Sequence, residues 1–303
     1  RMSYPLRFHH AGKIIGERYE IQCVLGQGGM GVVYQARHIS LEKLLAVKLL
    51  LIAQNEEYQR RFLQEAQLAS QINHPNTVFL SDFGVLPDGR SYIVMELLRG
   101  PTLASVIAEG RLDPMRACRI AAQIAHGLQA VHDLGIVHRD LKPENVFLLE
   151  QDGKKDNVKI VDFGIAKATG EAPIARKRNS QEDISLVSEQ KISAQTMPGT
   201  LMGTPAYLAP EMALGHEVDF RVDQYALGVI LYEMISGDLP FDATTIGQML
   251  QHHISTKPPL LSKRVSGSTP SLDALVARLL SKTPEARFPN MRAVAEALEK
   301  EIE

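Results

Sequence analysis

The chain has 303 residues, a formal net charge of −2, and 45% hydrophobic and 22% charged residues. This composition suits one large or two modest globular domains with a sizeable core, and the near-neutral charge gives no basic field for nucleic acid. The two cysteines, Cys23 and Cys118, lack metal-type spacing and fit small apolar side chains in a reducing compartment. No stretch is apolar enough to span a bilayer, and the start has no signal-peptide pattern, so we expect a soluble, cytoplasmic protein.

Elements expected along the chain fall into two groups. Runs of β-branched and aliphatic residues predict strands at Tyr19–Leu25, Val32–Arg37, Leu44–Leu51 and Ser91–Leu97, interrupted by one helix over Glu57–Ile72. After Gly100 the pattern is helical, with expected helices from Asp113-Pro114 onward and at Val222–Ser236, Ser271–Leu280 and Met291–Glu301. Strands followed by helices predict an α+β protein of two lobes with a cleft between them, and no internal repeat is present.

A glycine-rich turn separates the first two strands. The spelling G-x-G-x-x-G over residues 26–31, with Gly26, Gly28 and Gly31, also occurs in dinucleotide-binding folds, where it opens a helix. Here β-formers follow it, so we predict a β-hairpin whose backbone N–H groups can approach phosphate oxygens.

Two charged residues stand out in apolar surroundings. Lys48 lies in the aliphatic strand Leu45-Ala46-Val47-Lys48, and Glu65 falls within the apolar stripe of the helix over residues 57–72. A buried carboxylate is costly unless a cation pairs with it. We therefore predict that Lys48 and Glu65 form an ion pair in the cleft, against the alternative that Lys48 faces solvent.

The stretch His138-Arg139-Asp140-Leu141-Lys142-Pro143-Glu144-Asn145 is the most informative in the chain, and Asp162-Phe163-Gly164 follows a short strand at 158–161. Phosphoryl transfer needs a base near the acceptor hydroxyl, oxygen ligands for magnesium and cations over the developing charge. These chemical groups are supplied by Asp140, Lys142, Asn145 and Asp162.

These motifs resemble the protein kinase family, and residues 29–34 (Gly-Met-Gly-Val-Val-Tyr) look like its bacterial "eukaryotic-like" Ser/Thr branch. The resemblance runs from about residue 16 to residue 298. It implies a small β-rich N-lobe (about 13–95), a hinge (about 96–99) and a larger helical C-lobe (about 100–303) in one domain, 1–303.

The resemblance also assigns roles. Lys48 would hold the α- and β-phosphates, Asp140 would take the proton of the acceptor hydroxyl, and Lys142 would lie near the γ-phosphate. Asn145 and Asp162 would bind Mg²⁺, with Mn²⁺ as an alternative ion. The adenine of ATP would contact Val33, Ala46, Phe147, the gatekeeper Met95, and the backbone of Glu96 and Leu98.

The segment Gly203-Thr204-Pro205-Ala206-Tyr207-Leu208-Ala209-Pro210-Glu211 matches the part of the family that seats a peptide acceptor. By this resemblance Thr204 hydrogen-bonds the catalytic Asp and Lys, and Glu211 pairs with Arg287 as a structural anchor. Asp223 would brace the catalytic loop, and His138 would be packed as scaffold.

Residues 162–211 would then form the activation segment. Its polar stretch 176–200 is too poor in apolar residues to form a core of its own. Arg139 needs an anion, which a phosphate on this segment would supply. We predict autophosphorylation at Thr200 or Thr196 first, with Ser180 a weaker candidate.

The predicted function is transfer of the γ-phosphoryl of ATP to Ser or Thr hydroxyls of proteins, with a transient homodimer for autophosphorylation. Two alternatives remain: a small-molecule phosphotransferase of the same fold, and a catalytically silent scaffold. Cytoplasmic placement includes the case of a cytoplasmic domain within a membrane-anchored protein.

Overall fold

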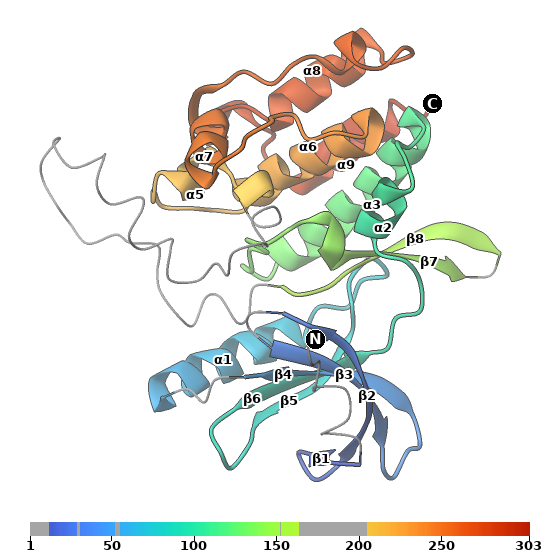
Figure 1. Ribbon diagram of the computed structural model, residues 1–303, viewed down its shortest axis with the longest axis vertical. Coiled ribbons are helices and arrows are strands. Elements are labelled where there is room, and N and C mark those ends of the chain that lie inside the picture. Colours follow the sequence, from blue (N-terminus) through green and yellow to red (C-terminus); the bar gives the residue numbers. More distant parts are fainter. Residues whose placement is uncertain (1–11, 29–30, 52–54, 152, 164–204) are drawn as a thin grey trace, which may run out of the picture.

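The computed structural model describes residues 12–28, 31–51, 55–151, 153–163 and 205–303. Within them the chain forms a sheet-rich lobe and a helical lobe, with a small hairpin between the two (Figure 1). The predicted two-lobed α+β architecture is therefore confirmed. None of the helices in these ranges is long and apolar enough to cross a bilayer.

An antiparallel sheet with the strand order β1-β2-β3-β4-β6-β5 forms the first lobe. Its strands are β1 (Ile14–Ile15), β2 (Tyr19–Gln27), β3 (Gly31–His38), β4 (Leu44–Leu50), β5 (Leu80–Val85) and β6 (Ser91–Glu96). The register Gly26↔Val33 and Gln27↔Val32 continues the β2–β3 ladder up to the glycine turn. The predicted hairpin is confirmed, because a strand and not a helix follows the glycines.

Helix α1 (Glu56–Ala69) lies beside this sheet (Figure 1). Asn55 caps its first turn by accepting a hydrogen bond from the Tyr58 N–H. The apolar stripe predicted from the 3.6-residue period is buried, with Phe62 and Ala66 fully inaccessible. The helix thus presents the predicted face to the core, and with it the single carboxylate in that stripe.

Most of the second lobe is helical. Its longer elements are α2 (Leu103–Ala108), α3 (Pro114–His132), α6 (Arg221–Ser236), α7 (Ile246–Ser255), α8 (Pro270–Leu279) and α9 (Met291–Glu299), and the short helix α5 (Pro210–Ala213) precedes α6. Helix α6 is buried over nearly its whole length and forms the centre of the lobe. Helix α3 packs against both α6 and α9, which places its C-terminal end near the start of α6.

The β7–β8 hairpin, formed by Val146–Gln151 and Lys154–Ile160, lies between the sheet and the helices (Figure 1). It contacts both sides of the junction. The Leu148 N–H donates to the Pro101 carbonyl, in the segment that leaves β6, and the Val78 N–H donates to the Ile160 carbonyl. The residues predicted for catalysis flank this hairpin, so the fold gathers them where the lobes meet.

Candidate active site

The loop after α3 is held in place by the buried carboxylate of Asp223. Asp223, at the start of α6 and 1% exposed, accepts hydrogen bonds from the backbone N–H groups of His138 and Arg139, both at 2.9 Å, and from His132 Nε2 at 2.7 Å. Burial alone would raise the pKa of Asp223, but these donors lower it below its usual value. The carboxylate therefore stays charged and fixes the loop, as predicted for Asp223.

His138 is fully buried and acts as scaffold in this geometry. Its Nε2 lies 2.9 Å from the Val161 carbonyl, and its ring meets the buried Phe163 edge-on, with centroids 5.7 Å apart. The loop is thereby joined to the segment that follows β8. Arg139 has a left-handed backbone, with φ of 61°, a conformation that costs energy in a non-glycine residue and often marks functional sites.

Asp140, Lys142 and Asn145 come together directly after this loop. Lys142 Nζ is 3.2 Å from Asp140 Oδ2, and both side chains are less than a quarter exposed. The Asn145 amide nitrogen donates to the Asp140 carbonyl at 2.8 Å. That bond leaves the amide oxygen of Asn145 as the atom able to bind a cation.

Asp162 and Lys48 link the two lobes. Asp162 follows β8 with φ of 62°, and its Oδ1 lies 2.7 Å from Lys48 Nζ on β4. The structure therefore brings the predicted phosphate lysine to the predicted metal ligand across the cleft.

The predicted ion pair between Lys48 and Glu65 is absent from this structure, because the ammonium of Lys48 is bound by Asp162 instead. Glu65 Oε2 is buried and has no hydrogen-bond partner within the described ranges, and the same holds for Arg139 Nε. Burial raises the pKa of Glu65 to about 7, although the nearby charges of Arg139 and Arg61 act to lower it. Glu65 thus faces the cation of the catalytic loop and not the cation of β4.

The glycines of the β2–β3 turn differ in whether packing within the protein requires glycine at that position. A Cβ on Gly31 would lie 2.6 Å from the Leu49 carbonyl oxygen, so packing of β3 on β4 requires glycine there. A Cβ on Gly26 or Gly28 would meet no atom of the described residues within 4 Å. The protein itself does not demand glycine at these two positions, which suits a backbone that a ligand approaches closely.

Predicted adenine contacts come from both sides of the junction. Ala46 on β4 is opposite Met95 on β6, and both are buried. Phe147 on β7 is half-buried and bridges to Thr102, just beyond the segment that contains Leu98. These apolar side chains lie where the two lobes join. Val33 on β3 is half-buried and packs against the same core.

Leu25 was not among the predicted site residues, but it lies next to the glycine turn. It is 48% exposed at a β-bulge of β2, directly before Gly26, and bulges of this kind re-aim side chains near sites. An apolar residue immediately before the glycine motif was the available signal, but the bulge that exposes it is not visible in sequence. Thr204, Thr196, Thr200 and Ser180 lie outside the described residues.

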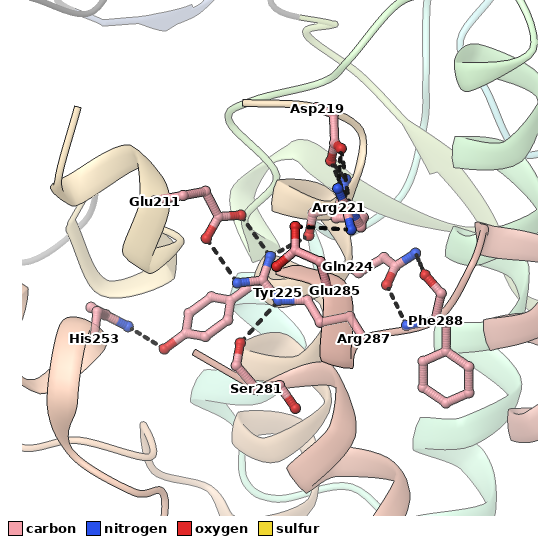
Figure 2. Close-up of polar contacts among 10 residues, drawn as sticks. All are labelled: Glu211, Asp219, Arg221, Gln224, Tyr225, His253, Ser281, Glu285, Arg287 and Phe288. Atoms are coloured by element: carbon pink, nitrogen blue, oxygen red, sulfur yellow. Dashed lines mark hydrogen bonds and ion pairs between the residues drawn. The ribbon is translucent and has the colours of Figure 1, made fainter. Parts of the chain in front are cut away.

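The predicted anchor between Glu211 and Arg287 is present (Figure 2). The Arg287 guanidinium donates two hydrogen bonds to the Glu211 carboxylate, at 2.6 and 2.8 Å, and further ones to the carbonyls of Arg221 and Ser281. Both side chains are almost inaccessible. The pair holds α5, and with it the end of the segment predicted to seat a peptide, against the helical lobe.

A sheet lobe and a helical lobe joined across a lysine–aspartate pair, beside a loop that carries Asp140, Lys142 and Asn145, define the two-lobed fold of protein kinases. The family model described as "Protein kinase domain" matches residues 19–299. This chain therefore belongs to the protein kinase domain family.

Relatives agree with this assignment. Serine/threonine-protein kinase pkn3 of Myxococcus xanthus is 36% identical over 307 residues, which cover 100% of this chain and 52% of that protein. Serine/threonine-protein kinase pkn2 of the same organism is 37% identical, over 94% of this chain and 32% of its own length. A crystal structure of a mutant PknI kinase domain from Mycobacterium tuberculosis matches with a TM-score of 0.68 and 26% identity over the whole of both chains. The chain thus spans about half of pkn3 and a third of pkn2.

Proposed function

We propose that this chain is an ATP-dependent protein serine/threonine kinase, which transfers the γ-phosphoryl group to hydroxyls of protein substrates. The observation that carries the proposal is the convergence of Asp140, Lys142, Asn145, Asp162 and Lys48 at one junction between the lobes. Names of the curated relatives support the same activity. The domain is proposed to be single, with its division into lobes as expected from sequence.

The position of each residue indicates its role in phosphoryl transfer. Asp140 is held beside the cation of Lys142, so it can orient an acceptor hydroxyl and take its proton while Lys142 balances the charge that develops on the transferred group. Lys48 can bind phosphate oxygens from the opposite lobe. Asp223 positions the loop without touching the reacting atoms, because it contacts backbone N–H groups.

Asp162 and Asn145 fit a magnesium ion that is bound together with nucleotide phosphates. Magnesium prefers one or two protein oxygens and takes its other ligands from phosphate and water. The Asp162 carboxylate and the amide oxygen of Asn145 offer that set. When bound, the ion neutralises charge between the phosphates.

A polypeptide acceptor is favoured over a small molecule by the anchored segment after residue 204. Glu211 and Arg287 hold its end, and a groove of about 810 Å³ opens beside Pro205 and Ala206, between the end of α6 and α7. An extended chain fits such an open groove, whereas a small phosphate acceptor needs a closed pocket.

Asp140→Asn decides between enzyme and silent scaffold. We expect the wild-type protein to transfer label from γ-labelled ATP to a generic basic protein, and the variant to lose at least about 100-fold in rate while still binding Mg-ADP. Asp88→Asn, in the exposed turn between β5 and β6, is the matched control and keeps activity. Equal failure of wild type and Asp140→Asn to transfer label, with intact nucleotide binding, contradicts the enzyme and favours the scaffold.

The small-molecule alternative is tested with the same preparation. Preferred labelling of an amino sugar or amino alcohol over any protein or peptide would support it. We expect protein acceptors to be labelled and these small acceptors to remain unlabelled.

We also propose that autophosphorylation regulates the enzyme through Arg139, whose Nε has no hydrogen-bond partner within the described ranges. A phosphate on Thr200 or Thr196 would bind this guanidinium. Mass spectrometry after incubation with Mg-ATP should find one of these residues modified in wild type and neither in Asp140→Asn. Active protein with both residues unmodified contradicts the idea.

Other expectations stay proposals of the same kind. The proposed binding partners are ATP and protein substrates, without nucleic acid, and a second copy of the chain in a transient homodimer for autophosphorylation. The proposed ion is Mg²⁺, with Mn²⁺ as an alternative, and the proposed location is cytoplasmic. The homodimer is tested by the concentration dependence of the initial autophosphorylation rate, which is first order in protein if the reaction stays within one molecule.

A further inference from the structure

Lys159 forms a polar junction with Glu96 at the end of β6 and with the chain before β5. It lies in β8, its side chain is 18% exposed, and its Nζ is 2.7 Å from Glu96 Oε1 and 3.1 Å from the Thr77 carbonyl oxygen. Glu96 Oε1 also accepts a hydrogen bond from the Phe79 N–H at 2.8 Å. One ammonium and one carboxylate thus join three segments: β8, the end of β6 and the chain leading into β5.

Strand alternation explains why a lysine in a buried hairpin can reach this place. Val158 and Ile160 are completely buried, so Lys159 between them points to the opposite face of β8. Backbone hydrogen bonds join the edge of β8 to the chain before β5, because the Ile160 N–H donates to the Asn76 carbonyl and the Val78 N–H to the Ile160 carbonyl. Lys159 therefore starts from a fixed backbone in the helical lobe.

Glu96 starts from the sheet lobe. It is the last residue of β6, and its own N–H donates to the Phe79 carbonyl at 3.1 Å. Its side chain is 32% exposed and is turned to Lys159 and Phe79. One oxygen of the carboxylate, Oε1, thus serves both contacts of this junction.

The strength of the pair follows from its burial. Exposed ion pairs contribute little, because water screens them and both side chains are flexible. Here the ammonium is largely buried and holds two oxygens on different segments, so its removal leaves a half-buried carboxylate with a single donor. The orientation of the Glu96 backbone should loosen as a result.

We propose that Lys159 is a positioning residue for nucleotide binding, which acts through Glu96 to fix the hinge backbone that contacts adenine. The inference rests on the proposed ATP-dependent function. Lys159 itself touches neither nucleotide nor acceptor. Its effect is on the affinity for the nucleotide and not on the chemical step.

Lys159→Met tests this, with Lys155→Met as the matched control, since Lys155 lies four residues earlier in β8 and is exposed. We measure the KM for ATP, kcat and the Kd for Mg-ADP by calorimetry. Lys159→Met should raise the KM and the Kd by about five-fold, the equivalent of one ordinary hydrogen bond to the nucleotide, and leave kcat within about two-fold. Lys155→Met should match wild type, and Lys159→Arg should restore most of the affinity.

A purely structural role gives a different result. It would lower the melting temperature of Lys159→Met without changing the KM or the Kd, and that result overturns the proposal. A change in kcat at unchanged KM overturns it as well. Glu96→Gln should weaken Mg-ADP to a similar extent, and the double variant should lose no more than the larger single loss; full additivity overturns the pairing.

The two levels of the proposal are distinguishable. A wild-type protein that binds Mg-ADP but transfers no phosphate contradicts the proposed function, while a weaker Kd in Lys159→Met would still support the positioning role. A wild-type protein that does not bind Mg-ADP overturns both.

Discussion

Glu65 is the residue whose surroundings depart most from expectation, and its charge gives a direct test. The folded-state pKa of about 7 lies above the ordinary value of 4.5, so the favourable contribution of the protonated carboxyl is complete below pH 4.5 and is lost as pH rises through 7. Glu65→Gln should therefore raise the melting temperature relative to wild type more at pH 8.5 than at pH 5. Glu56→Gln, exposed in the first turn of the same helix, is the control. A pH-independent difference for Glu65→Gln would show that Glu65 is already paired with a cation.

The pKa of His253 is shifted in the opposite direction from that of Glu65, so its pH dependence can be tested in the same way. His253 is completely buried against Tyr225 (Figure 2), and burial followed by the charge of Lys282 lowers its pKa from 6.5 to about 4. The stability that depends on neutral His253 is complete above pH 6.5 and is lost as pH falls toward 4, by up to about 3 kcal/mol. Denaturant unfolding of His253→Gln should show a flatter pH dependence in this window. Tyr225→Phe removes the hydroxyl that contacts His253 Nδ1 and Lys282 Nζ but keeps the titrating imidazole, so a pH dependence should remain. A slope unchanged in His253→Gln contradicts the assignment.

At the scale of elements, the glycines of the β2–β3 turn separate packing from binding. Gly31→Ala would press a Cβ onto the Leu49 carbonyl, and we expect a loss of about 1–3 kcal/mol in the free energy of unfolding. The new Cβ of Gly28→Ala meets no atom within 4 Å in the part of the chain that the structure describes. Its stability should therefore stay near wild type while Mg-ADP binds about five-fold more weakly, as for one lost backbone hydrogen bond. Calorimetry and denaturant unfolding measure the two effects. Equal effects of both variants on both quantities would remove the distinction.

The junction of α5 with the end of the helical lobe depends on one buried ion pair. Arg287→Met leaves the Glu211 carboxylate buried without a cation, which should cost about 3–5 kcal/mol. Arg221→Met breaks a more exposed pair with Asp219 in the same view (Figure 2) and should cost less than about 1 kcal/mol. Denaturant unfolding compares the two. The double variant Glu211→Gln with Arg287→Met should recover part of the loss, and no recovery would mean that lost packing, not the lone charge, dominates.

At the scale of the whole molecule, contiguous motifs were predictable and contacts between lobes were not. Asp140, Lys142 and Asn145 lie within six residues, so their spacing alone implied a common site. The partner of Lys48 depends on where α1 rests against the helical lobe, which no local pattern specifies. Among the strands and α-helices, the sequence did not predict β1, β5, β7, α2, α5 and α7. Two of them show why: β5 contains Ser, Asp and Gly, and α7 has a polar, histidine-rich sequence, so their stability comes from tertiary packing and not from propensity.

The site between the lobes also predicts how the intact molecule responds to ligand. A nucleotide that bridges Lys48 on β4 and Asp162 after β8 binds only the folded, two-lobed state, so it stabilises by mass action, by about 2.7 kcal/mol at one hundred times its Kd. For a chain of this size that corresponds to a rise in melting temperature of about 4 °C with Mg-ADP. Because the Asp162 carboxylate is the strongest oxygen donor in the proposed metal set, EDTA should remove most of this rise in wild type, and Asp162→Asn should show only the smaller rise that ADP gives without metal. Asp88→Asn serves again as the control and should respond like wild type. An Asp162→Asn protein with the full magnesium-dependent rise would show that the ion is not bound by the Asp162 carboxylate.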